Sequence, residues 1–293
     1  MKEFENLPEQ LRPGDFFEEM EICKPIDPDC LIYKNTFVAL VDIIGYKNIL
    51  KRHEKDTPRY IYQDLINTFS WIKSKYKALQ CTLFSDTFLI EGLDDHSINF
   101  WNIVSLLTQL QFYFLLKGIM VRGAITFGEH FHKNSILISP ALIDAHNLER
   151  ETKFPRIVFD DIVYNLVTRD VFTFNDKKIL KVDKYGVEVN LNLLLKDSDN
   201  NNVLSFIPSH VELDYLKYNC HPDMKNINNH KNHCVDVGNE LLSKLKDQLL
   251  IIDSQAQKLT KHEKDKAFYL ISRWNNYLED FKNSHLLKDD YSI

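Results

Sequence analysis

The chain has 293 residues, of which 44% are hydrophobic and 12% aromatic, enough for one large domain with an accessory segment. Its formal net charge of −6 gives no general attraction for nucleic acid or for an acidic membrane surface, although a local site can still bind a small anion. The cysteines are odd in number and scattered, and the first residues are polar and acidic. We therefore expect neither a disulfide framework nor a secretory signal, but a cytoplasmic protein.

The first third of the chain predicts a short β-α-β-β unit. Residues 1–34 combine several prolines with many acids and are expected to form a loosely ordered N-terminal arm. A strand follows at about 36–44, and residues 57–79 have helical periodicity. Residues 80–92 then predict two short strands around a turn at Ser85–Asp86.

The next segment repeats the alternation. A helix is expected from about 97 to 117, ended by Gly118, followed by a strand over 119–131. Ser139 and Pro140 open a further helix, and the next strand lies in 155–161. The order β-α-ββ-α-β-α-β predicts a ferredoxin-like α+β fold with a mixed or antiparallel sheet.

The C-terminal part is expected to form a hairpin over 172–190, a polar loop and two helices, at about 236–258 and 262–282, whose aromatic residues dock on the core domain. We accordingly divide the chain into an arm (1–34), a core domain (35–190) and a C-terminal segment (191–293).

One polar stretch, "CHPDMKNINNHKNHC" at 220–234, collects cysteine and histidine side chains. Zinc uses such ligands, but the C-x₂-C half of a zinc finger is missing, so we expect a mobile polar loop. As a loop, it could cover a ligand or act as a sensor.

Two aspartates carry the strongest chemical signal. Asp42 ends one hydrophobic strand and Asp86 lies at the turn between two others. If the first strand pairs with the hairpin, both carboxylates lie at one edge of the sheet, where each raises the pKa of the other unless cations are present. Two Mg²⁺ ions would resolve this repulsion and would suit in-line displacement at phosphorus. Alternatively, Asp42 caps the next helix and Asp86 forms an Asx turn.

Four blocks, "FVALVDIIGYKNIL", "LFSDTFLIEG", "IMVRGAITFGE" and "SPALIDAHNLE", resemble the signature blocks of class III nucleotidyl cyclases, in order. In that family, two aspartates hold two Mg²⁺ or Mn²⁺ ions while the 3′-hydroxyl of a nucleoside triphosphate attacks its own α-phosphate. The resemblance implies that Asp42, Asp86 and the backbone carbonyl of Ile43 are the metal ligands. It also makes residues 35–190 the catalytic domain.

The chain departs from the purine cyclases at several positions. Thr82 replaces their base-reading lysine, and Ile136 stands where they have an acidic or polar residue. Their ribose-orienting asparagine falls at Ile143 and their transition-state arginine at Asn147. Either the chain is a degenerate relative, or its pocket is rebuilt for another base.

A second resemblance favours the rebuilt pocket. "DIIGY", "VRGAITFGE", "KFPRIVFD" and the terminal "YLISRWNNYLEDF" are similar to the pyrimidine cyclases of bacterial anti-phage (Pycsar) systems. These make cyclic UMP or cyclic CMP, a messenger that activates a separate effector protein. The resemblance implies UTP or CTP as substrate, with UTP favoured. Tyr46 is then a candidate for the wall beside the base, or alternatively a core aromatic.

A cation must also balance the charge of the departing pyrophosphate. Arg122 is the first candidate, because Gly123 beside it permits close approach of the backbone; alternatively it pairs with Glu129 or Asp144. Arg156 is a weaker candidate. The family implies a head-to-tail homodimer that shares each site between subunits. A purine cyclase and a catalytically inactive nucleotide sensor remain alternatives.

Overall fold

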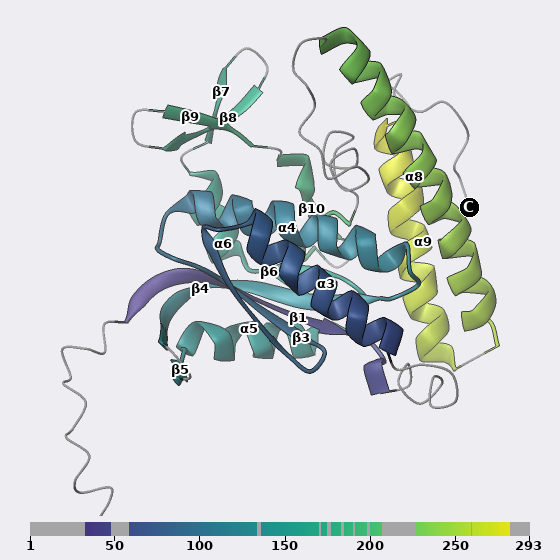
Figure 1. Ribbon diagram of the computed structural model, residues 1–293, viewed down its shortest axis with the longest axis horizontal. Helices are drawn as coiled ribbons and strands as arrows, with labels where there is room; N and C mark the ends of the chain where they lie inside the picture. The colour runs from purple at the N-terminus through teal and green to yellow at the C-terminus, as the bar shows by residue number, and fades with distance from the viewer. Residues whose placement is uncertain are drawn as a thin grey trace, which may run out of the picture.

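The computed structural model describes ten stretches of the chain, drawn in colour in Figure 1: 33–47, 59–133, 136–169, 171–174, 177–182, 185–189, 191–197, 200–206, 227–258 and 260–281. Nearly all of the expected N-terminal arm and the first half of the 220–234 stretch lie outside these residues.

An eight-stranded mixed sheet forms the centre of the molecule, with the strand order β10-β11-β6-β4-β1-β3-β2 and β5 paired with β4 (Figure 1). Only β4 and β6 pair in parallel; the other pairs are antiparallel. The α+β fold with a mixed sheet is therefore confirmed. The strands are β1 Lys34–Ile43, β2 Leu79–Phe84, β3 Thr87–Gly92, β4 Val121–Lys133, β5 Ile136–Ile138, β6 Ile157–Phe159, β10 Leu194–Lys196 and β11 Asn202–Leu204.

Helices cover both faces of this sheet. One face packs against α3 (Arg59–Lys75), α4 (Ser97–Leu115) and α6 (Asp161–Thr168), and the other against α5 (Pro140–Glu151). β1 is buried on both faces, since Phe37, Ala39 and Val41 join the first cluster while Val38 and Leu40 contact the α5 side. This explains why β1 has a continuous apolar run instead of an alternating one.

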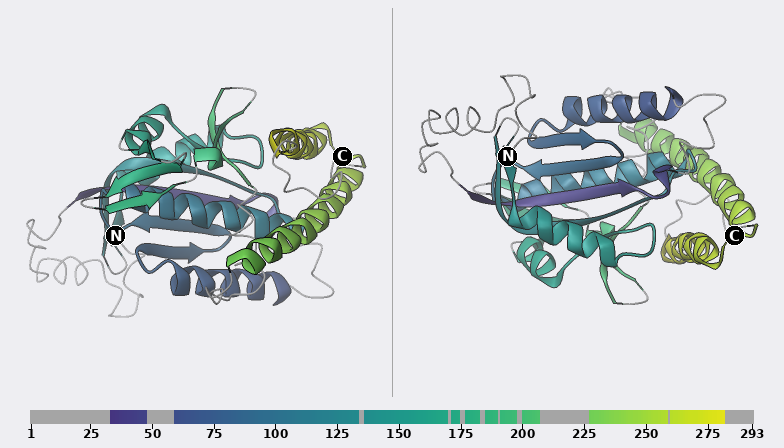
Figure 2. Two further views of the ribbon diagram at one scale, coloured as in Figure 1. Left: turned by 90° about the horizontal axis from the view of Figure 1, so that it is seen from above. Right: turned by 90° about the horizontal axis from the view of Figure 1, so that it is seen from below.

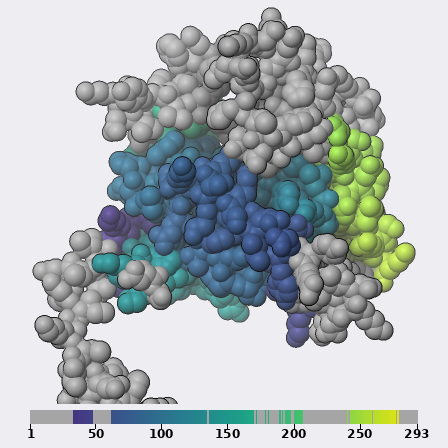
Figure 3. Space-filling model, viewed as in Figure 1, coloured from purple at the N-terminus to yellow at the C-terminus, as the bar shows by residue number. Residues whose placement is uncertain are grey.

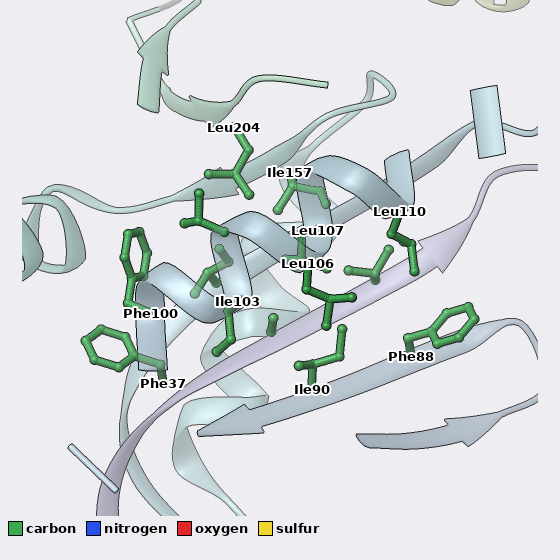
Figure 4. Packing of buried hydrophobic residues seen from close by; sticks show 14 of the residues in the cluster. Phe37, Phe88, Ile90, Phe100, Ile103, Leu106, Leu107, Leu110, Ile157 and Leu204 are labelled. Carbon is green, nitrogen blue, oxygen red and sulfur yellow. The ribbon is translucent and has the colours of Figure 1, made fainter. Parts of the chain in front are cut away.

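The main core lies between α4 and the sheet. In Figure 4, side chains of α4 such as Ile103 and Leu106 point toward Phe37, Phe88 and Ile90 of β1 and β3. All five are fully buried, and each such burial contributes about 1.5–3 kcal/mol. This core fixes the position of β1, and with it the aspartate at its end.

Local signals in the sequence set the boundaries of several elements. Gly118, with φ of +72°, follows α4 as expected. Ser139 caps α5, accepting a hydrogen bond from the Leu142 backbone N–H at 2.9 Å. The β2–β3 connection is a two-residue turn in which Ser85 has φ of +59°, a conformation that hairpin turns require.

The C-terminal helices, α8 (Ile227–Ala256) and α9 (Lys261–Phe281), pack on each other and on the outer side of α4. Phe112 and Leu115 of α4 share a buried cluster with Leu245 and Trp274. Both views of Figure 2 show the helix pair at one side of the core, and in Figure 3 the later part of α8 borders the face covered by α3.

Some expectations were wrong. Residues 227–234, expected in a polar loop, form the first turns of α8, because packing further along a helix stabilises polar turns that composition alone does not favour. The expected hairpin over 172–190 is a three-stranded sheet of β7 (Val171–Phe174), β8 (Lys177–Val182) and β9 (Tyr185–Glu188).

The short strands β5, β10 and β11 were missed because three residues carry too little periodicity to recognise. β10 and β11, which follow a 3₁₀ turn at Leu191–Leu193, continue the main sheet beyond the proposed domain boundary at 190. Among the described residues, no helix has both the length and the apolar character needed to cross a membrane.

Candidate active site

The pairing of β1 with β3 brings the two aspartates together at one end of the sheet. Asp42 lies opposite Thr87, the residue after Asp86, and the Ile43 backbone N–H donates to the Asp86 carbonyl oxygen at 3.3 Å. The tight turn at Ser85 holds Asp86 at this position. The carboxylate at the end of β1 and the one in the β2–β3 turn are therefore close enough for the charge of Asp86 to act on Asp42.

The environment of Asp42 disfavours its charged form. Burial raises the pKa of this carboxyl, and the charge of Asp86 raises it further, while Arg122 and a hydrogen bond from Thr87 oppose the shift. The Thr87 hydroxyl donates to Asp42 Oδ1 at 3.3 Å. Since repulsion and burial outweigh attraction, the site favours additional positive charge.

Arg122, near the start of β4, supplies part of that charge. It lies opposite Asp42 in the strand register, and its Nη2 is 3.6 Å from Asp42 Oδ2. Its Nε forms an ion pair with Glu149 Oε1 of α5. The acids considered from sequence, Glu129 and Asp144, are not the ones that it contacts in these ion pairs.

Glu149 was missed by the sequence analysis. Its side chain is 5% exposed, and its pKa is raised by burial and by Asp42, against the lowering effect of Arg122. The sequence did contain a pattern that indicates it. Glu149 follows Ala141 and Ala145 at intervals of four residues, which places it on the buried face of α5.

Lys266 of α9 lies within the range of the charge of Arg122. Burial lowers the pKa of its ammonium group and the charge of Arg122 lowers it further, against the opposite effect of Glu263. Lys266 is therefore close enough to Arg122 for the positive charge of the guanidinium to lower the pKa of the ammonium group. No sequence pattern indicates this lysine, because its position relative to Arg122 depends on how α9 docks.

These residues fit divalent cations. Asp42 and Glu149 share the guanidinium of Arg122, and the charge of a third carboxylate, that of Asp86, acts on Asp42. Oxygen donors at a site that lacks positive charge are the preferred environment of Mg²⁺ and Mn²⁺. The carbonyl of Ile43 belongs to the same strand end.

Tyr46 lies beside this site. It is partly buried against the main core, and burial raises the pKa of its hydroxyl, with further contributions from Tyr62 and from the charge of Asp86. The two interpretations made from sequence, a core aromatic and a wall of the site, are thus compatible. Gly45 before it has φ of +75°, which turns the chain from β1 toward Tyr46.

Three further candidates from the sequence analysis are Thr82, Ile136 and Asn147. Thr82 on β2 points to the same sheet face as Asp42, as the register through Leu89 requires, and is half-buried. Ile136 on β5 is 45% exposed, and Asn147 is exposed on α5. The structure does not bring Ile136 or Asn147 into contact with the aspartates of their own chain.

Arg156 is a structural connection between segments in this chain. Its side chain is 9% exposed and forms an ion pair with Asp197, and its guanidinium carbon lies 5.5 Å from the ring centre of Phe154 and 5.8 Å from that of Tyr269. These contacts connect the residue before β6 to α9 and to the segment after β10.

No family model matches the sequence, and no curated protein matches it. Among solved structures, similar folds include the adenylyl cyclase CyaB from P. aeruginosa (14% identity, TM-score 0.41, covering 59% of this chain and 95% of that chain). They also include the guanylate cyclase domain of RhGC from Catenaria anguillulae in complex with GTP (14%, 0.37, 58% and 93%) and a bacterial light-regulated adenylyl cyclase (12%, 0.36, 54% and 89%). All three are nucleotide cyclases.

Proposed function

We propose that this protein is a pyrimidine nucleotide cyclase that converts UTP or CTP into the 3′,5′-cyclic monophosphate and pyrophosphate. The observation that carries the proposal is the pairing of Asp42 and Asp86 at one end of the sheet, with the pKa of Asp42 raised by burial and by its neighbour. Two carboxylates held together against their repulsion are suited to binding divalent cations.

In the proposed reaction, the ribose 3′-oxygen forms a bond to the α-phosphorus, the bond from that phosphorus to the bridging oxygen breaks, and the hydroxyl proton passes to solvent. Asp42, Asp86 and the Ile43 carbonyl hold Mg²⁺ or Mn²⁺. When bound, two such ions lower the pKa of the hydroxyl and neutralise the leaving group.

Arg122 and Lys266 balance the charge of the triphosphate. The Arg122 side chain is 34% exposed, with Nε paired to Glu149 and Nη2 3.6 Å from Asp42, so it would bind phosphate by exchanging Asp42 for a phosphate oxygen. Bidentate contacts to phosphate oxygens suit that planar group. Lys266 adds charge from α9, which gives the C-terminal segment a role in the site.

The choice of base depends on Tyr46 and Thr82. Tyr46 lies beside Asp86 and narrows the site, and Thr82 shares the sheet face of Asp42. A smaller pyrimidine is compatible with an aromatic ring at that wall. UTP is favoured over CTP, and a role in anti-phage defence through a separate effector is inferred, on the sequence resemblance alone.

We propose a homodimer, which would bring Asn147 of one subunit to the site of the other. Apolar side chains are exposed on elements next to the site: Phe84, just before the Ser85–Asp86 turn, at 47%, and Ile143 of α5 at 63%. Sedimentation equilibrium of the wild type and of Ile143→Asp tests this, with a dimer expected only for the wild type. A monomeric wild type would contradict it.

A second candidate, a nucleotide sensor without turnover, is favoured by one observation. Arg122 is already engaged by Glu149 and Asp42, and would have to exchange partners to contact phosphate.

A turnover assay distinguishes these functions. The full chain is incubated with Mn²⁺ and each of ATP, GTP, CTP and UTP, and products are identified by mass spectrometry. We expect cyclic UMP or cyclic CMP, at least about 100-fold less in Asp42→Asn and Asp86→Asn, and no change in Asp144→Asn, an exposed aspartate of α5.

The other possible results of this assay would each support a different function. Cyclic AMP or cyclic GMP as the product would show a purine cyclase. Nucleotide binding by calorimetry without any product would favour the sensor. Full turnover in Asp42→Asn would refute the role of the aspartates.

A further inference from the structure

A second group of candidate metal ligands lies at the other end of β3. Glu91 on β3 and His130 and His132 on β4 each offer one donor atom, and these atoms all lie within 4.8 Å of one another. Four residues, or about 13 Å of strand, separate Glu91 from Thr87 beside Asp42. The group is therefore distinct from the proposed active site and does not depend on the function proposed for it.

Glu91 is 1% exposed, and an unpaired carboxylate there would cost several kcal/mol. Among the described residues, the ion-pair partners found for it are the two histidines. His130 Nε2 lies 3.1 Å from Glu91 Oε1, and His132 Nδ1 lies 2.9 Å from Glu91 Oε2. The carboxylate is thus compensated only if positive charge is present at this point.

His130 has the arrangement of a metal ligand. Its Nδ1 is 2.8 Å from Ser139 Oγ, which also accepts from the Leu142 backbone N–H. Donation from Nδ1–H to that hydroxyl leaves the lone pair on Nε2. This atom is fully buried and has no hydrogen bond of acceptable geometry, although it faces Glu91. A histidine whose outer nitrogen is fixed by a hydrogen bond is typical of metal sites.

With the Gln80 amide oriented as the structure has it, His132 cannot satisfy both of its neighbours by hydrogen bonding alone. Its Nδ1 lies near both Glu91 oxygens and also 2.9 Å from Gln80 Nε2. If Nδ1 carries a proton, it can donate to Glu91, but it then meets the N–H of Gln80, a second donor. If Nδ1 carries a lone pair, it can accept from Gln80, but it then meets the carboxylate, a second acceptor. A cation among the three side chains removes the conflict, and Gln80, with its amide turned, can offer its oxygen.

We propose that Glu91, His130 and His132 bind one Zn²⁺ ion, with Gln80 or water as the fourth ligand. Two imidazole nitrogens and one carboxylate suit zinc, whereas Mg²⁺ and Ca²⁺ prefer sites made of oxygen alone. The ion would join β3 to β4 and, through Ser139, to the first turn of α5.

Metal content and thermal stability test the proposal. The untagged full chain is stripped with EDTA, reloaded with Zn²⁺, desalted and analysed by mass spectrometry for zinc, and its melting temperature is measured with and without the ion. His132 is the least buried of the three, at 11% exposure, so His132→Gln is the first variant. His262→Gln, an exposed histidine of α9, is the matched control.

We expect the wild type and His262→Gln to retain the same zinc content and to melt at a higher temperature with zinc. His132→Gln and Glu91→Gln should retain one equivalent less and lose that shift. An unchanged zinc content in both variants, or no zinc in the wild type, would overturn the proposal and leave a hydrogen-bonded network.

Two more measurements are needed. One tests the zinc site if the variants do not fold, and the other tests whether zinc binding is independent of the proposed active site. If the variants do not fold, X-ray absorption at the zinc edge of the wild type decides, since nitrogen and oxygen ligands are expected and sulfur ligands would overturn the assignment. Asp42→Asn should retain the zinc, so failure of the proposed cyclase activity and failure of this zinc site are independent results.

Discussion

Asp42→Asn is the sharpest test of the electrostatics, because we expect it to abolish activity and yet stabilise the metal-free fold. At 3.6 Å, the attraction between Asp42 and Arg122 is about 1 kcal/mol in water and about 5 kcal/mol at an effective dielectric constant of about 20. The raised pKa of Asp42 shows that burial and Asp86 together exceed this attraction. Each contribution is a few kcal/mol, so we expect a net gain of about 1 kcal/mol.

A gain of that size raises the melting temperature by about 1.5–2 °C in a protein of this length. The pH dependence has a definite sign. A carboxyl whose pKa is raised on folding contributes stability that is present below its ordinary pKa and lost as the pH rises through the raised value. Without divalent ions, the wild type should therefore lose stability from about pH 4 upward, and Asp42→Asn should lose less.

The assay is thermal unfolding followed by circular dichroism at pH 5 and pH 7, in EDTA and in excess Mn²⁺. Asp144→Asn serves as the control, since its exposed side chain should change neither curve. Manganese should stabilise the wild type more than Asp42→Asn. A clear fall in melting temperature for Asp42→Asn in EDTA would refute the reasoning, because attraction to Arg122 would then dominate.

Three further predictions concern packing and burial. A Cβ at Gly123 would clash with the Leu40 carbonyl oxygen, so Gly123→Ala should lower the free energy of unfolding by about 1–3 kcal/mol in urea titrations. Gly128→Ala is the control, because a Cβ there would lie 3.5 Å from the Ala141 Cβ, an ordinary contact distance. It should change the free energy of unfolding by less than about 0.5 kcal/mol. Trp274→Ala should cost about 3–5 kcal/mol, against almost nothing for the exposed Phe268→Ala. Burial raises the pKa of Cys81 to about 12, so iodoacetamide at pH 8 should label it only after denaturation, as peptide mass spectrometry would show.

The order of the main elements could be predicted because each carries a strong local signal. β1 has an uninterrupted apolar run, α5 begins with a serine cap and a proline, and α4 ends before Gly118. From that order follows the pairing of β1 with β3, which brings Asp42 and Asp86 together.

The partners of these aspartates could not be predicted in the same way. Glu149 and Lys266 reach the site only through the docking of α5 and α9, which depends on tertiary packing. The group of Glu91, His130 and His132 was missed because its members lie on strands that are separated by β1 in the sheet and far apart in sequence. Sequence analysis also did not anticipate that Arg156 contacts Asp197.

The position of Lys266 on α9 has a consequence for synthesis of the protein. A ribosome releases the strands that carry Asp42, Asp86 and Arg122 long before α9, so the sheet can form while the chain is still being made. The charge from α9 joins Arg122 only after the last helix has emerged and docked on α4. A nascent chain can therefore assemble the acidic half of the site without its full complement of cations, and a truncated product would carry aspartates that repel each other.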